Sequence, residues 1–167
     1  MVKRLFFRGA PLLTVLLFVI IVSMPIQITG YSTTAPFLAF PTLCYWSIFA
    51  PTVLPFYALF FLGLLQDILS NPDILGLNAG LFLLARMLLE LEQRFFVNQG
   101  FVALCLTLAA VSFAFFLLKT IITFFLASAP FSLMPFVLQY IFTFFLLPPL
   151  IWSLIHLRNF LARRNLL

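Results

Sequence analysis

The side chains that could do chemistry are few, and the first pair to consider is Asp67 and Asp73. Two carboxylates held together can act as general acid and base. These two lie six positions apart, which is not one face of a helix, and an Asn-Pro step intervenes. His156 stands alone near the end of an apolar run, where we interpret it as an interfacial side chain. The pattern therefore does not favour paired-carboxylate catalysis.

The two cysteines, Cys44 and Cys105, fall in separate apolar runs without the close spacing of metal or redox sites. We interpret both as small buried side chains. The sequence also carries no phosphate-binding loop or dinucleotide fingerprint. We therefore expect a protein that is not an enzyme, with no cofactor, no metal and no catalytic residue.

Composition indicates what kind of protein positions these residues. The chain has 167 residues, of which 65% are hydrophobic and 8% are charged, whereas about 25% charged is usual for a soluble domain. The net charge is +5, but the basic residues gather toward the chain ends beside apolar runs. This distribution is typical of the positive-inside rule and not of a nucleic-acid surface. We predict an integral membrane protein with lipid as its neighbour and no nucleic-acid partner.

Apolar windows and their breaks predict an all-α fold of six transmembrane helices in a single domain, residues 1–167. The expected spans are about 10–28, 36–50, 52–69, 72–91, 98–126 and 133–157. The second and third are short, so a tight or re-entrant hairpin is an alternative there. We expect the first span to be uncleaved, because its apolar run is long for a signal peptide. Pro148 and Pro149 should kink the sixth.

The positions of the basic residues favour six spans over five. With six spans and a cytoplasmic N-terminus, Lys119 is the one basic residue of nine left on the outer side. A five-span arrangement would export the basic C-terminal segment. We therefore expect both termini in the cytoplasm, with Lys119 at the outer interface.

Residues 63–80, GLLQDILSNPDILGLNAG, gather two aspartates and three of the six glycines. Asn71 suits a helix N-cap, Pro72 the first helical position and Asp73 the first turn, so these residues predict the start of the fourth helix. Gly76 and Gly80 form a GxxxG pair, which lets helices approach closely in lipid. We predict that this pair packs against the third span.

Gly63 on the third span would suit the same close approach. Asp67 follows one turn later, where an aspartate is unfavourable unless it reaches water or a partner. It lies at the outer interface, or accepts hydrogen bonds from the exposed N–H groups of the fourth helix, or makes a polar contact with a partner or ligand. Gln66 and Asn78 would share whichever network exists.

Arg86, Glu90 and Arg94 follow one another at i,i+4 spacing, which predicts a helix that continues out of the membrane on the cytoplasmic side. This segment is either a solvated helix end or a docking surface for a cytoplasmic partner.

Residues 45–88, YWSIFAPTVLPFYALFFLGLLQDILSNPDILGLNAGLFLLARML, resemble the bacterial rod shape-determining protein MreD family. The features that match are Tyr45-Trp46, Pro51, Pro55, and GLLQD followed nine residues later by the glycine of LGLNA. By that match the motif positions are Gly63, Asp67, Gly76 and Gly80, with roles in helix packing and partner binding. The sixth span departs from the family in its few polar residues, so nothing is carried over there.

The resemblance implies a non-enzymatic scaffold of the cell-wall elongation complex in the bacterial inner membrane, which regulates cell shape. The implied partners are an MreC-like protein and, indirectly, MreB, RodA and a class B penicillin-binding transpeptidase. The implied fold is similar to the substrate-binding subunits of energy-coupling-factor transporters, so a vitamin-type transporter subunit is the alternative. A transporter should offer convergent polar groups in a cavity. This chain has few such groups, and we expect a scaffold without a small-molecule ligand.

Overall fold

The computed structural model describes residues 9–23, 37–51, 54–70, 75–91, 93, 100–126 and 133–163. Throughout these ranges the secondary structure is helical, without a strand, as the sequence predicts. The helices are α2 (Ala10–Ser23), α3 (Ala39–Phe49), α4 (Phe56–Ser70), α5 (Leu77–Leu91), α7 (Phe101–Leu126) and α8 (Leu133–Arg163).

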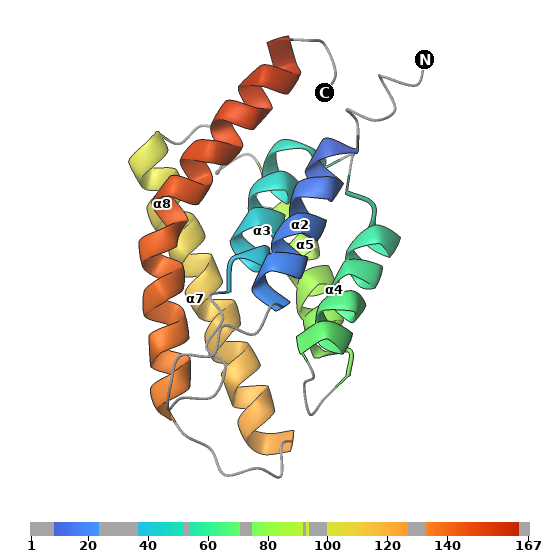
Figure 1. The fold of residues 1–167 in the computed structure, drawn as a ribbon, viewed down its shortest axis with the longest axis vertical. Helices are drawn as coiled ribbons and strands as arrows, with labels where there is room; N and C mark the ends of the chain where they lie inside the picture. The colour runs from blue at the N-terminus through green and yellow to red at the C-terminus, as the bar shows by residue number, and fades with distance from the viewer. Residues whose placement is uncertain are drawn as a thin grey trace.

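Consecutive helices run in alternating directions along the long axis of the molecule (Figure 1). The beginning of α2 and the end of α8 therefore lie at the same end, which we call the α8 end. The corner between α4 and α5 lies at the opposite end, which we call the corner end. Each helix matches one expected span, although α5 begins later than predicted and α8 continues to Arg163.

Two of the described helices are long and apolar enough to cross a membrane, with qualifying segments at Phe101–Leu126 and Val137–Leu161. Both lie side by side and antiparallel (Figure 1). α3 has 11 residues, about 16 Å of helix against a hydrocarbon core of about 30 Å. The described part of the chain therefore contains two helices of spanning length and several that are shorter.

The short helix α3 forms the centre of the core. Ten of its 11 residues are buried, and its sequence is apolar on all sides, as expected for a helix enclosed by others. Aromatic rings join it to its neighbours: Phe40 lies 6.1 Å from Phe82 of α5 and 4.9 Å from Phe115 of α7 between ring centroids. α3 is thus the element against which α2, α5, α7 and α8 pack.

α8 is one continuous helix through Pro148 and Pro149. Each proline lacks an N–H and removes one hydrogen bond from the helix. The helix changes direction between its lower and upper halves (Figure 1), as the two prolines predict.

Candidate functional site

Asp67 lies in the last turn of α4 and is fully buried. Its carboxylate accepts hydrogen bonds from the backbone N–H groups of Gly76 at 3.0 Å, Asn78 at 3.2 Å and Ala79 at 3.4 Å. The side-chain amide of Asn78 donates a further bond of 2.7 Å. One carboxylate from α4 therefore satisfies the N-terminal backbone of α5.

The first N–H groups of a helix have no acceptor within that helix, and the helix dipole places partial positive charge there. The carboxylate of Asp67 carries the opposite charge. The attraction between this carboxylate and the N-terminus of α5 therefore offsets the cost of burying each of them away from water. The interpretation that Asp67 accepts bonds from the following helix is the one that the structure bears out. A direct contact between Asp67 and a partner or ligand stays a prediction; in this chain alone the side chain is enclosed and its oxygens accept bonds from the start of α5.

Gly63 lies one turn before Asp67 on α4, where it permits the close approach of α5. A Cβ atom at Gly63 would lie 2.7 Å from the backbone N of Ala79 and closer still to its Cα. Gly76 has φ of +91° and begins the turn into α5, a conformation that favours glycine. A Cβ at Gly80 would meet nothing within 4 Å. Gly80 therefore makes no close contact with α4, and Gly76 meets α4 through its N–H alone, whereas Gly63 makes the predicted close approach, against Ala79.

The helix that follows this corner begins at Leu77, after a turn at Leu75 and Gly76. The prediction of a continuous helix from residue 72 is wrong, because the positive φ of Gly76 interrupts it. The predicted cap residues Asn71, Pro72 and Asp73 lie outside the described residues.

Of the two neighbours expected to join Asp67, Asn78 does so through two donors. Gln66 is buried beside it, and its Oε1 has no hydrogen-bond partner in the described structure. The Nζ of Lys119 on α7 lies 5.0 Å from the centroid of the Phe37 ring. The positive charge of Lys119 is attracted by Asp67. Lys119 therefore faces neighbouring helices, and its expected position at the outer interface stays a prediction.

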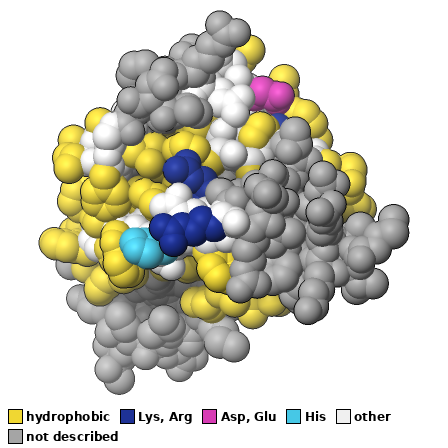
Figure 2. Space-filling model, turned by 90° about the horizontal axis from the view of Figure 1, so that it is seen from above, with side chains coloured by type: hydrophobic (Ala, Val, Ile, Leu, Met, Phe, Trp, Pro, Cys, Tyr) yellow, Lys and Arg dark blue, Asp and Glu magenta, His cyan; other side chains and the backbone are white. Residues whose placement is uncertain are grey.

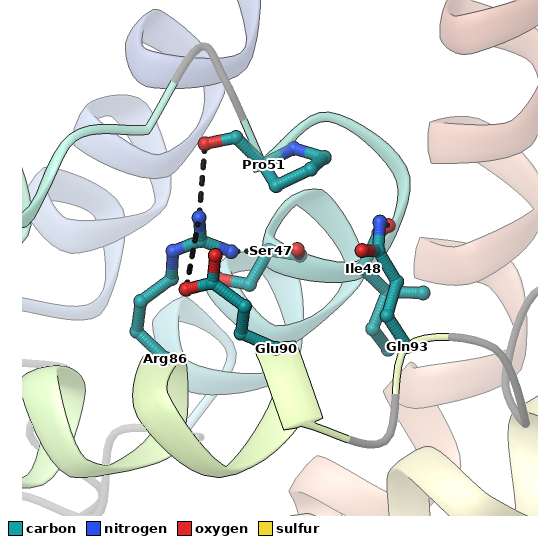
Figure 3. Close-up of polar contacts among 6 residues, drawn as sticks. All are labelled: Ser47, Ile48, Pro51, Arg86, Glu90 and Gln93. Atoms are coloured by element: carbon teal, nitrogen blue, oxygen red, sulfur yellow. Dashed lines mark hydrogen bonds and ion pairs between the residues drawn. The ribbon is translucent and has the colours of Figure 1, made fainter.

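Arg86 of α5 forms a second buried charged centre, shown in Figure 3. Its side chain is only 4% exposed. Nη1 donates to the carbonyl oxygen of Ser47 at 2.9 Å, and Nη2 donates to that of Pro51 at 3.0 Å. Because the last carbonyls of α3 lack donors within the helix and carry partial negative charge, the guanidinium caps this terminus.

Two further side chains complete the ends of α3. Gln93 donates from Nε2 to the carbonyl oxygen of Ile48 at 2.6 Å (Figure 3). At the other end, the N–H of Phe37 donates to the hydroxyl oxygen of Thr143 on α8 at 2.8 Å. A short helix enclosed by other helices cannot obtain these partners from water. The carboxyl end of α3 is therefore satisfied by side chains from other elements, and the segment that leads into α3 is bonded to α8.

The outcome differs among the three charged residues that the sequence places in one series, Arg86, Glu90 and Arg94. Arg86 and Glu90 form an ion pair with an N–O distance of 3.6 Å, as their spacing predicts. Glu90 is half-exposed, but Arg86 is buried, so the interpretation of Arg86 as a solvated or docking residue is wrong. Arg94 lies outside the described residues.

These two centres stabilise charge and do not expose a reactive group. Each of them places a buried ion against the helix terminus of opposite partial charge, and the described positions contain no group of three His, Cys, Asp or Glu side chains suited to a metal. Comparison of the chain with known protein families, curated proteins and solved structures found no match.

Proposed function

We propose that this chain is a multi-pass scaffold of the bacterial inner membrane that takes part in cell-wall elongation. In this role it binds an MreC-like protein and, through it, helps couple MreB, RodA and a class B transpeptidase to peptidoglycan synthesis. The proposal rests on the resemblance of residues 45–88 to the MreD family.

The observation that carries the proposal is the set of contacts between Asp67 on α4 and the start of α5. The resemblance depends on GLLQD and the glycine of LGLNA, and in the structure Asp67 and Gly76 from these two motifs bond to each other. Gly63 from the first motif permits the contact between the same two helices. The motif residues thus build a tightly joined helix corner, which suits a protein whose task is to hold a fixed shape for its partners.

The alternative, a small-molecule transporter subunit, would need polar groups free to meet a ligand. Asp67 and the side-chain amide of Asn78 are the strongest candidates for such contacts, and they bond to each other at 2.7 Å. The scaffold is therefore the better supported of the two functions.

The proposed membrane arrangement has six crossings with both termini in the cytoplasm. The two long helices support crossing directly. The alternating directions of the shorter helices support the remaining crossings (Figure 1). Arg158 and Arg163 lie on the last turns of α8, so the positive-inside rule assigns the α8 end to the cytoplasm. The corner formed by α4 and α5 then faces the outer side.

Depletion of the protein in rod-shaped cells tests the scaffold role. We expect the cells to become round, and we expect the tagged protein to co-purify with an MreC-like, single-span partner. The control is re-expression of the wild-type chain, which should restore rods. Rods that persist after depletion, together with loss of vitamin uptake, would exclude the scaffold and favour the transporter.

A further inference from the structure

An apolar groove lies between the two longest helices. Its volume is about 230 Å³, and it is half open to the outside. α7 contributes one wall and α8 the other. The lining residues are Phe101, Val102, Cys105, Leu106, Ala109, Phe144, Leu147 and Pro148. No charged side chain is among them, so the groove suits a hydrocarbon chain and not a polar metabolite.

The length of the groove along α7 is close to the thickness of one leaflet of a bilayer. Its α7 residues run from Phe101, the first residue of that helix, to Ala109, about 12 Å along the axis. Half of the hydrocarbon core is about 15 Å. Because Phe101 begins α7, the groove starts toward the α8 end and leads inward from there.

Basic side chains gather at that same end, beside the histidine (Figure 2). α8 carries Arg158 and Arg163 beyond the groove. The guanidinium of Arg158 lies 4.4 Å from the centroid of the Phe49 ring, which holds it against α3. Arg163 is exposed.

The acidic residues at the described positions do not neutralise these arginines. Asp67 is buried at the corner end, and Glu90 pairs with Arg86. Among the described residues, Arg158 and Arg163 at the α8 end therefore present positive charge to an anion from outside the chain.

We propose that the groove between α7 and α8 holds an acyl chain of an anionic phospholipid whose phosphate lies against Arg158 and Arg163. Charge complementarity selects this occupant over a neutral lipid, and anionic lipids are abundant in the cytoplasmic leaflet. The proposal rests on membrane insertion of α7 and α8 and on the orientation given above. It does not depend on the scaffold role, so either can fail without the other.

The test uses the full chain in vesicles of phosphatidylethanolamine and phosphatidylglycerol in equal amounts. After mild extraction, native mass spectrometry measures the lipid that stays bound. We expect the wild type to retain phosphatidylglycerol in preference to phosphatidylethanolamine. Leu106→Trp fills the groove and should abolish this retention. Leu117→Trp is the matched control, because Leu117 is also exposed on α7 but does not line the groove.

Arg163→Gln tests the headgroup contact at an exposed position and should reduce the preference for phosphatidylglycerol while leaving some lipid bound. If Leu106→Trp does not fold, as judged by its melting temperature against Leu117→Trp, Val102→Trp at the exposed edge of the groove replaces it. Equal retention of the two lipids by the wild type would overturn the proposal. So would unchanged retention after the groove is filled, or a partner protein found in the groove in place of lipid.

Discussion

Asn78 binds Asp67 twice, through its backbone N–H and through its side-chain amide, the latter at 2.7 Å. The first residues of α5 are thereby joined to the last turn of α4. Buried polar groups of this kind are stable only when their partners are in place. The corner between α4 and α5 is consequently the feature most sensitive to substitution.

Asp67→Ala should destabilise the protein strongly. It leaves the N–H groups of Gly76, Asn78 and Ala79 without their acceptor, and an unsatisfied buried donor costs about 1–3 kcal/mol. Asp67→Asn keeps one acceptor oxygen and should be less severe. Thermal unfolding in detergent measures both, with Glu90→Gln as the control at a half-exposed carboxylate. A melting temperature of Asp67→Ala equal to that of the wild type would contradict the capping role.

The same substitution distinguishes a structural from a contact role in complex assembly. Because Asp67 is enclosed, we expect Asp67→Ala to lower the amount of protein and the amount of complex with the MreC-like partner by the same factor. Quantitative co-purification gives the ratio of the two. A ratio that falls well below the wild-type value would show that Asp67 acts on the partner beyond its effect on folding.

Substitutions of three glycines by alanine should differ in their effect on the stability of the protein. Gly63→Ala drives a methyl group into the backbone of Ala79 and should cost about 1–3 kcal/mol, as overpacking does. Gly76→Ala imposes the positive φ on an L-residue, at about 1–2 kcal/mol. Gly80→Ala meets open space and should be neutral or stabilising by about 0.5–1 kcal/mol, because alanine favours helix. Melting temperatures of the three variants check the order, and a destabilising Gly80→Ala would refute it.

Arg86→Lys should destabilise the protein, although it conserves charge. A lysine ammonium is a compact donor and lacks the planar fork that reaches the carbonyls of Ser47 and Pro51 together. Loss of one charged hydrogen bond costs about 1.5–3 kcal/mol. Glu90→Gln removes only the half-exposed partner and should change stability by less than about 1 kcal/mol. Equal effects of these two substitutions, measured by thermal unfolding, would argue against the cap on α3.

Cysteine accessibility tests the proposed orientation of the corner end and the α8 end. In a chain with Cys44→Ala and Cys105→Ser, a membrane-impermeant maleimide added to intact spheroplasts should label Leu75→Cys, which is exposed near the corner. Arg163→Cys at the α8 end should react only after the membrane is permeabilised. Labelling of both variants in intact spheroplasts would contradict the proposed orientation.

The helical class and several helix bounds follow from local sequence. Hydropathy is a property of a local window, so a run such as Phe101–Leu126 is recognised without knowing its neighbours. The i,i+4 pair of Arg86 and Glu90 is equally local and was predictable. The first residue of α5 was not predictable, because the turn at Gly76 depends on the hydrogen bond from the Gly76 N–H to Asp67.

The directions of the polar side chains depend on how the helices pack against one another. Arg86 turns inward to the end of α3, and Gly63, which the sequence predicted to allow a close approach, meets Ala79 and not Gly80. Both outcomes depend on the rotation and register of one helix against another, which a single sequence does not specify. Asp67 is buried and saturated for the same reason, since its donors come from the next helix across a turn.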